Sequence, residues 1–149
     1  MSAVAGISNL RFFAKLTEAT DKDVVARLAR ELGDDVAPTF AAAALAREKR
    51  SPTGLPFGDV GVAIPHAEPE HVKTPAIVIA SLAAPVSFRQ MGSPKTLVPV
   101  TLVVMPALSA KEQAAAGLTS IIELLQNADI RAALLRAQTA DELRAALGS

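Results

Sequence analysis

Two strongly apolar stretches in the middle of the sequence constrain its fold more than any other feature. Residues 76–82 read AIVIASL, and residues 98–105 read VPVTLVVM, with Pro99 near the start of the second stretch. Both have the length and the β-branched content of buried strands, and both fall well short of the roughly 18 apolar residues of a membrane-spanning helix. We therefore expect a sheet in the interior, with the second stretch as a central strand.

Weaker signals surround these two stretches. Residues 60–64 predict a short strand, residues 86–88 a short strand or a bend, and residues 92–95 a turn. The prolines and glycines that precede and follow residues 60–64 predict structured loops on both sides of that strand.

Helical patterns lie before the strands. Residues 21–32 carry an apolar stripe at helical spacing, with Thr20 as the expected N-cap and Gly33 as a stop. Residues 38–49 form an Ala-rich run in which Pro38 suits the first helical position, where its missing N–H costs nothing.

Helical patterns also follow the strands. Ser109 opens an S-x-x-E capping box for a helix that should continue to about Gln126. Asn127 should cap a helix over residues 130–136, and Thr139 should open a last helix that reaches Leu147, with Gly148 as its stop. The order of elements predicts an α/β fold, in which a single mixed β-sheet is flanked by helices on both faces.

Composition narrows the possible functions. A chain of 149 residues suits one domain, so residues 1–149 are assigned to a single domain. The 15 basic side chains balance 15 acidic ones, which argues against a nucleic-acid partner. The absence of Cys excludes disulfides, thiol nucleophiles and zinc–cysteine sites. The N-terminus lacks the pattern of a signal peptide, so we expect a cytoplasmic protein, and we expect no cofactor.

The candidate chemistry lies in a segment rich in proline and glycine. Residues 51–75 contain five prolines and three glycines, and both histidines of the chain, His66 and His71, fall within them. His66 follows the predicted strand and Pro65, and a neutral imidazole is a competent nucleophile toward phosphorus. Phosphoryl transfer asks the protein mainly for positioning and for groups that stabilise the phosphoryl oxygens, so such a site is chemically sensible.

Several motifs in this part of the chain resemble one family. Residues 47–49 read REK, residues 51–54 read SPTG, and residues 61–66 read GVAIPH; further on, APVSF occupies residues 84–88. Together with the order of the later elements, they resemble enzyme IIA domains of the fructose/mannitol type from the sugar phosphotransferase system, over nearly the whole chain. The resemblance implies a phosphotransferase that carries a phosphohistidine in sugar transport.

The resemblance also assigns residues and partners. It implies that His66 accepts a phosphoryl group from the carrier protein HPr and passes it to a cysteine of enzyme IIB, and indirectly serves the membrane enzyme IIC. Arg47 matches the arginine that helps to hold the phosphoryl oxygens. Mannitol-type members have a second histidine early in the helix after the central strand, and Gln113 is its nearest counterpart in this sequence. This difference points toward the galactitol-like branch. Asp59 lies one position out of register with their upstream glutamate, so it receives no catalytic role.

Other interpretations remain open at this point. A nitrogen-type relative would use the same fold for regulation through its phosphorylation state. A metal-dependent hydrolase could use His66, Glu68, Glu70 and His71 as ligands, but their spacing matches no strong metal motif, and Pro69 disfavours one helical face. Arg47 could also be only a favourable cation at the end of a helix, and His71 an exposed loop residue.

Overall fold

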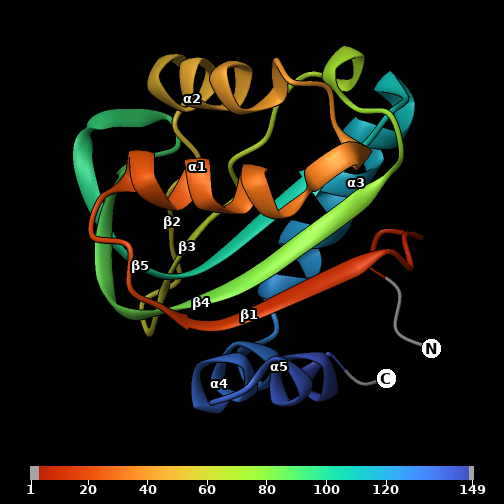
Figure 1. Cartoon of the computed structure of the whole chain (residues 1–149). Helices are drawn as coiled ribbons and strands as arrows, with labels where there is room; N and C mark the ends of the chain where they lie inside the picture. The colour runs from red at the N-terminus through yellow and green to blue at the C-terminus, as the bar shows by residue number, and fades with distance from the viewer. Residues whose placement is uncertain (1–3, 148–149) are drawn as a thin grey trace.

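The computed structural model of the protein describes residues 4–147 and arranges them around one five-stranded sheet (Figure 1). The strands are β1 (Leu10–Leu16), β2 (Leu55–Pro56), β3 (Gly61–Ala63), β4 (Ala76–Gln90) and β5 (Ser93–Ala107), in the order β1-β4-β5-β3-β2. β4 and β5 form a long antiparallel hairpin, β1 runs parallel to β4, and β3 runs parallel to β5. The predicted mixed sheet is confirmed, and β5 is its central strand.

Helices cover both faces of the sheet, as predicted. α1 (Asp21–Glu31) and α2 (Phe40–Arg50) pack on one face, whereas α3 (Lys111–Leu125), α4 (Ala128–Arg136) and α5 (Ala140–Ala146) pack on the other (Figure 1). The alternation of side chains along β4 creates the two cores, because neighbouring residues of a strand point to opposite faces. Val78 and Ala80 join the core under α1 and α2, and Ile77 and Ile79 join the core under α3–α5.

Three of the predicted helix caps are confirmed. The side chain of Thr20 accepts a hydrogen bond from Asp23 N, that of Asn127 from the amides of Asp129 and Ile130, and that of Thr139 from Glu142 N. Each contact satisfies an amide that the helix itself leaves unpaired, and such a cap typically contributes about 1 kcal/mol. Gly148, the expected stop of the last helix, lies outside the described residues.

Two helices begin later than predicted. α2 begins at Phe40 rather than Pro38, and Thr39 occupies its N-cap position without a side-chain cap. α3 begins at Lys111 after Ala110, so the prediction that Ser109 caps this helix is wrong. Instead, the amide of Ser109 donates to Gln113 Oε1 at 3.3 Å, so a glutamine in the first turn of α3 supplies the acceptor for this backbone N–H before the helix.

The strands differ most from the sequence-based expectation. β1 was not predicted, because Phe12 and Phe13 break a clear alternation and its partner β4 lies far along the chain. β4 and β5 are each 15 residues long, about twice their apolar segments, because both continue as a hairpin past those segments. Val86 and Phe88 in the extension of β4 still pack into the core, whereas residues 93–97 of β5 lie outside it. The hairpin reverses at residues 91–92, where Gly92 has a positive φ of 75° that suits glycine, so the turn overlaps the predicted residues 92–95 only at Gly92, and residues 93–95 already belong to β5.

Within residues 4–147, no helix has both the length and the apolar character that crossing a bilayer requires.

Candidate active site

The end of β3 positions His66. β3 lies directly beside the central strand β5, and this close approach requires Gly61, because a Cβ atom there would collide with the backbone carbonyl of Pro99. Pro65 then turns the chain out of the strand, and the imidazole of His66 remains half-buried at the end of the sheet. The position of His66 is therefore set by the end of β3 and by Pro65.

Both ring nitrogens of His66 have defined partners. Nδ1 lies 2.8 Å from the backbone carbonyl oxygen of Ile64, and Arg47 Nε donates to Nε2 at 3.0 Å. A carbonyl oxygen can only accept, so Nδ1 carries the proton and donates it to Ile64 O. Nε2 then holds the lone pair, which makes it the nucleophilic nitrogen of this ring.

The surroundings of His66 favour the neutral form of its ring. Burial lowers the pKa of His66 below its usual 6.5, and the positive charge of Arg47 lowers it further. The hydrogen bond to Ile64 and the charge of Glu68 act in the opposite direction and are outweighed. The surroundings therefore favour the neutral imidazole, which is the form of the ring that can act as a nucleophile.

Two arginines from the end of α2 gather around a single carboxylate beside this histidine. Glu68 Oε1 lies 3.7 Å from Arg47 Nη1 and 3.2 Å from Arg50 Nη2. The pKa of Glu68 is lowered, first by a hydrogen bond from its own backbone amide and then by these arginine charges. The carboxylate of Glu68 holds the guanidinium group of Arg47 near His66. It also neutralises part of the positive charge that would be available to an incoming phosphoryl group.

A buried chain of hydrogen bonds supports the histidine from behind. Glu48, only 8% exposed, accepts from Thr53 N at 2.8 Å and from Thr53 Oγ1 at 2.7 Å. Thr53 Oγ1 in turn accepts from Ile64 N at 3.0 Å, and the carbonyl of Ile64 holds His66 Nδ1. Burial raises the pKa of Glu48, while its bonds to Thr53 oppose that rise.

Glu48 and Thr53 were not predicted as site residues from the sequence. Both were visible in the REK and SPTG motifs, yet neither is adjacent to His66 in sequence, and their contact with its backbone depends on how the chain folds. They act through Ile64 and are therefore positioning residues.

α3 contributes the other side of the histidine's surroundings. Ala114 and Leu118 of this helix, with Pro106 at the end of β5 and Leu108 just after it, line a small hollow beside His66. Gln113 directly precedes Ala114 in the first turn of α3. Its amide oxygen accepts from Ser109 N, which leaves its amide N–H groups as the donors available to a ligand.

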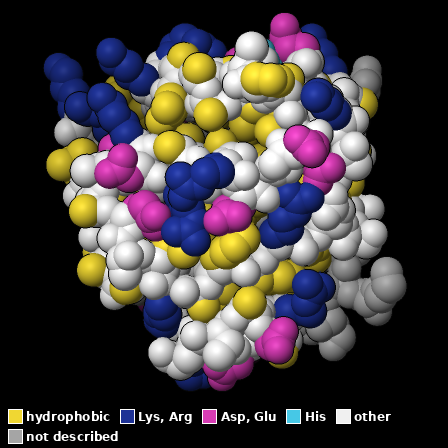
Figure 2. Space-filling view, in the orientation of Figure 1, with side chains coloured by type: hydrophobic (Ala, Val, Ile, Leu, Met, Phe, Trp, Pro, Cys, Tyr) yellow, Lys and Arg dark blue, Asp and Glu magenta, His cyan; other side chains and the backbone are white. Residues whose placement is uncertain are grey.

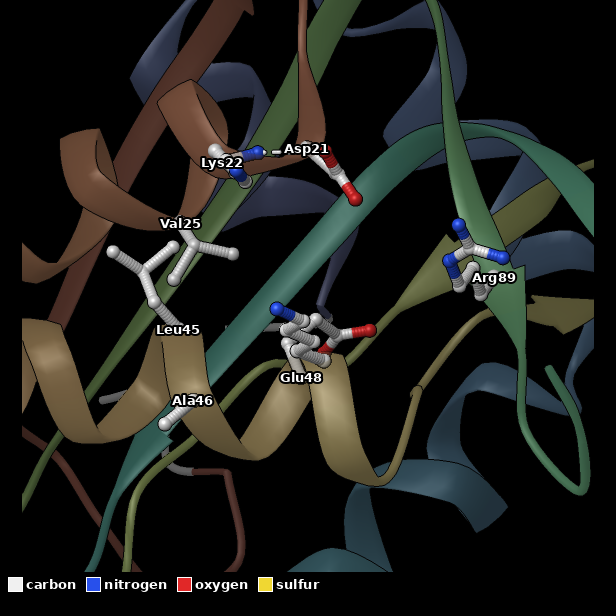
Figure 3. A pocket seen from close by; sticks show the side chains of 8 residues that line it. Asp21, Lys22, Val25, Leu45, Ala46, Glu48 and Arg89 are labelled. Atoms are coloured by element: carbon white, nitrogen blue, oxygen red, sulfur yellow. Dashed lines mark hydrogen bonds between the residues drawn. The ribbon is translucent and has the colours of Figure 1, made fainter.

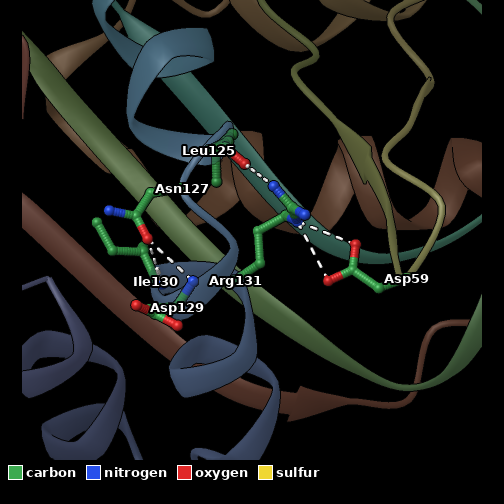
Figure 4. A network of polar contacts seen from close by, with 6 residues as sticks. All are labelled: Asp59, Leu125, Asn127, Asp129, Ile130 and Arg131. Carbon is green, nitrogen blue, oxygen red and sulfur yellow. Dashed lines mark hydrogen bonds and ion pairs between the residues drawn. The ribbon is translucent and has the colours of Figure 1, made fainter.

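Two other candidate residues lie away from this constellation. His71 Nδ1 is 2.8 Å from Thr39 Oγ1, at the start of α2. Asp59 lies before β3, at the opposite end of that strand from His66, and its carboxylate pairs with Arg131 of α4 at 3.0 Å (Figure 4). The structure therefore gives Asp59 a structural partner, in agreement with the absence of a catalytic assignment.

The proposed metal ligands do not converge. Glu68 turns to the arginines of α2, and His71 turns to Thr39. Over residues 4–147, no group of three or more His, Asp or Glu side chains is placed to hold a metal ion.

Comparison with known proteins identifies the family. Residues 7–149 match the sequence profile of the phosphoenolpyruvate-dependent sugar phosphotransferase system, EIIA 2. A nitrogen regulatory protein of Pseudomonas aeruginosa is 38% identical over 117 residues, which cover 78% of this chain and 72% of the relative. The 2-O-α-mannosyl-D-glycerate-specific EIIABC component of Escherichia coli is 34% identical over 101 residues, 68% of this chain but only 15% of that much longer protein.

A solved structure supports the same assignment of the fold. The complex of enzyme IIA mannitol and phosphorylated enzyme IIB mannitol from Escherichia coli contains a chain that superposes with a TM-score of 0.74 at 22% identity. The match covers 92% of this chain and 93% of the other. The sequence profile, the relatives and the fold lead to one conclusion: this chain belongs to the EIIA 2 family of the phosphoenolpyruvate-dependent sugar phosphotransferase system.

Proposed function

We propose that this protein is a phosphoryl relay of a sugar phosphotransferase system, with His66 as the acceptor. The observation that carries the proposal is the pair of contacts at His66, in which Ile64 O fixes the proton on Nδ1 and Arg47 approaches Nε2 at 3.0 Å. This arrangement supplies a neutral nucleophile and a cation within reach of the phosphoryl oxygens.

The relay consists of two displacements at phosphorus. In the first, Nε2 of His66 forms a bond to the phosphorus of phosphohistidine on HPr, and the bond between that phosphorus and the HPr ring nitrogen breaks. In the second, a thiolate of enzyme IIB attacks the same phosphorus, and the bond to Nε2 breaks. The proton on Nδ1 stays hydrogen-bonded to Ile64 O throughout, so His66 needs no proton exchange with solvent to return to its starting form.

Enzyme IIB is the proposed acceptor because a complex between an enzyme IIA and a phosphorylated enzyme IIB is known for a protein of the same fold. The membrane enzyme IIC would then receive the phosphoryl group on its sugar only through IIB. HPr is the proposed donor on the basis of the family alone.

Gln113 is a further proposed contact to the phosphoryl group. Its N–H groups can donate to a phosphoryl oxygen but cannot add positive charge, so Arg47 would be the main cation of the site. Because Gln113 stands where mannitol-type members have a second histidine, we also propose that the chain belongs to the galactitol-like branch. Gln113→Ala should slow labelling by HPr by about three- to ten-fold, whereas Gln126→Ala, a matched change at the far end of α3, should leave the rate unchanged.

A labelling experiment tests the relay directly. Incubation with radioactive phospho-HPr should give an acid-labile phosphate on the wild-type protein and none on His66→Ala, with circular dichroism to confirm that the variant is folded. Phosphate on a folded His66→Ala protein would disprove the assignment. Addition of a panel of purified IIB domains should then remove the label from the wild type.

A regulatory role is the second candidate, and the 38% identity to a nitrogen regulatory protein favours it. In this alternative, His66 is still phosphorylated, but the phosphorylation state controls binding to a target protein. Failure of every IIB domain to discharge the labelled protein, together with normal labelling, would support regulation over transport.

A further inference from the structure

A second cavity lies on the face of the sheet that α1 and α2 cover. It measures about 560 Å³ and is formed by the first turn of α1, the second half of α2 and the outer part of β4. Figure 3 shows Val25 of α1 and Leu45 of α2 facing each other on one side of this cavity, with Arg89 of β4 on the opposite side. A space of this size falls within the range of small-molecule sites.

The walls of the cavity combine an apolar surface with an excess of positive charge. Val25, Leu45 and Ala46 supply the apolar part, whereas Lys22, Lys49 and Arg89 outnumber the two carboxyl groups of Asp21 and Glu48. In Figure 2, Lys and Arg side chains gather at the upper left, toward the C-terminal end of α2 and the β4–β5 turn.

The cations of the cavity are available, and its carboxyl groups are engaged. Among residues 4–147, the structure gives neither Lys22 nor Lys49 an ion-pair partner. Arg89 uses one N–H group for Pro94 O and retains others. Both oxygens of Glu48 accept from Thr53, and Asp21 Oδ1 accepts from the amide of Lys22 at the start of α1.

Two residues that line the cavity, Glu48 and Arg89, also bind residues 53–54, the segment that supports His66. The side chain of Glu48 binds Thr53, and the backbone carbonyl of Arg89 accepts from Gly54 N at 3.0 Å. A Cβ atom on Gly54 would lie 2.6 Å from that carbonyl oxygen, so residue 54 must be glycine for β4 to approach closely enough to form this hydrogen bond. Glu48 therefore holds Thr53 and Arg89 holds the next residue, Gly54, while the hydroxyl of Thr53 accepts from Ile64 N.

From these contacts we propose that the cavity between α1, α2 and β4 binds a small carboxylate with an apolar body, and that its occupancy is transmitted to His66 through Thr53. The carboxylate pairs with Lys22, Lys49 and Arg89, and the apolar body covers Val25 and Leu45. A ligand that contacts the lining residues shifts Glu48 or Arg89, and the Thr53 hydroxyl and the amide of Ile64 move with them. The effect on phosphorylation rests on the function proposed above, whereas binding and transmission do not.

Nuclear magnetic resonance titration of the unphosphorylated protein tests binding. Hexanoate is the probe, and hexanamide is its neutral control of nearly the same shape. We expect saturable shifts of the cavity amides with a dissociation constant on the order of 1 mM for hexanoate, and weaker binding of hexanamide. Equal binding of the two probes, or no saturation by hexanoate, would overturn the proposal.

Two variants locate the bound probe. Lys49→Gln should weaken hexanoate binding by about two- to five-fold, whereas Lys111→Gln, a matched loss of charge on the opposite face of the sheet, should not change it. Ala46→Phe should abolish binding, because Ala46 is exposed on α2 and a ring there fills the cavity without disturbing the core. Unchanged binding by Ala46→Phe would show that the probe binds elsewhere.

The same titration tests transmission. The amide signals of Thr53 and Ile64 and the ring signals of His66 should move with the same dissociation constant as the cavity signals. In Thr53→Val the ring signals should no longer respond, while Thr53→Ser, which keeps the hydroxyl, should preserve the response. Saturation of the cavity without any movement at His66 in the wild type would refute the coupling.

Phosphoryl transfer from HPr provides the last measurement. Hexanoate at saturation should change the labelling rate of the wild type at least about two-fold and leave that of Ala46→Phe unchanged. If labelling of the wild type fails altogether while hexanoate still binds and shifts His66, the proposed function is wrong and the cavity assignment stands.

Discussion

Arg47 Nε–H donates to the lone pair of His66 Nε2 at 3.0 Å, so the guanidinium group covers the nitrogen that the proposed relay would phosphorylate. In that relay the arginine would have to leave the ring nitrogen before it could hold the phosphoryl oxygens. Glu68, whose Oε1 lies 3.7 Å from Arg47 Nη1, gives the side chain a nearby anion toward which it can turn.

Removal of this side chain should have two opposite effects. Arg47→Gln should slow phosphorylation by phospho-HPr by about 10² to 10³-fold, because the phosphoryl oxygens lose their cation. The same change should raise the pKa of His66, because the positive charge that lowers it is gone. The pKa is measured by titration of the ring C2 proton, and labelling rates are compared with those of Arg50→Gln. Equal slowing in both variants would mean that the site needs only general positive charge.

Thr53 should contribute strongly to stability for a residue of its size. Thr53→Val removes the hydroxyl that serves both Glu48 and Ile64, and so leaves a buried carboxyl group and a buried amide without this partner. We expect the free energy of unfolding to fall by about 2–4 kcal/mol, measured in urea. Thr53→Ser should lose much less. A valine variant as stable as the wild type would show that the hydroxyl is dispensable.

The pKa of His66 predicts how stability depends on pH. Because the folded state holds this pKa below 6.5, the unfolded state binds more protons between the two pKa values. The contribution of His66 to the free energy of unfolding should therefore be complete above pH 6.5 and should decline as the pH falls toward the folded pKa. The difference in unfolding free energy between the wild type and His66→Gln, measured from pH 7.5 to 5, isolates this contribution. A difference independent of pH would contradict it.

Asp59 should prove unnecessary for phosphorylation. Its carboxylate is paired with Arg131, whose side chain is only 9% exposed, donates to Leu125 O at 2.8 Å and lies 4.8 Å from the centre of the Phe57 ring. Asp59→Asn should keep the labelling rate within about two-fold of the wild type. Arg131→Ala should instead lower the free energy of unfolding by about 2 kcal/mol or more, because it also leaves a buried carbonyl unpaired. A large loss of labelling in Asp59→Asn would require a catalytic role for this residue.

Sequence reasoning succeeded where the determining contacts are local. Thr20, Asn127 and Thr139 cap helices that begin at the next residue, so the capping pattern was sufficient. It failed at Ser109, where the side chain of Gln113 binds the backbone instead.

The features that sequence reasoning missed depend on contacts between distant residues. β1 exists because Leu10–Leu16 pairs with β4, more than sixty residues later, and Lys15 departs from strand geometry with a φ of 57°. In the candidate site, the motifs indicated His66 and Arg47. The path from Glu48 through Thr53 to Ile64 could not be read from spacing, because it joins three separate segments through side-chain oxygens.

The partner of His66 Nδ1 is a main-chain carbonyl, and this has a thermodynamic consequence for the proposed relay. A phosphoryl group on Nε2 makes the ring more acidic, so the hydrogen bond to Ile64 O strengthens and lowers the group-transfer potential of the phosphohistidine. A carboxylate in that place could be exchanged by a single substitution, whereas the carbonyl of residue 64 remains whatever side chain that residue carries. In the proposed relay, the free energy of the phosphorylated state would thus be set by the course of the backbone and would be insensitive to most point mutations.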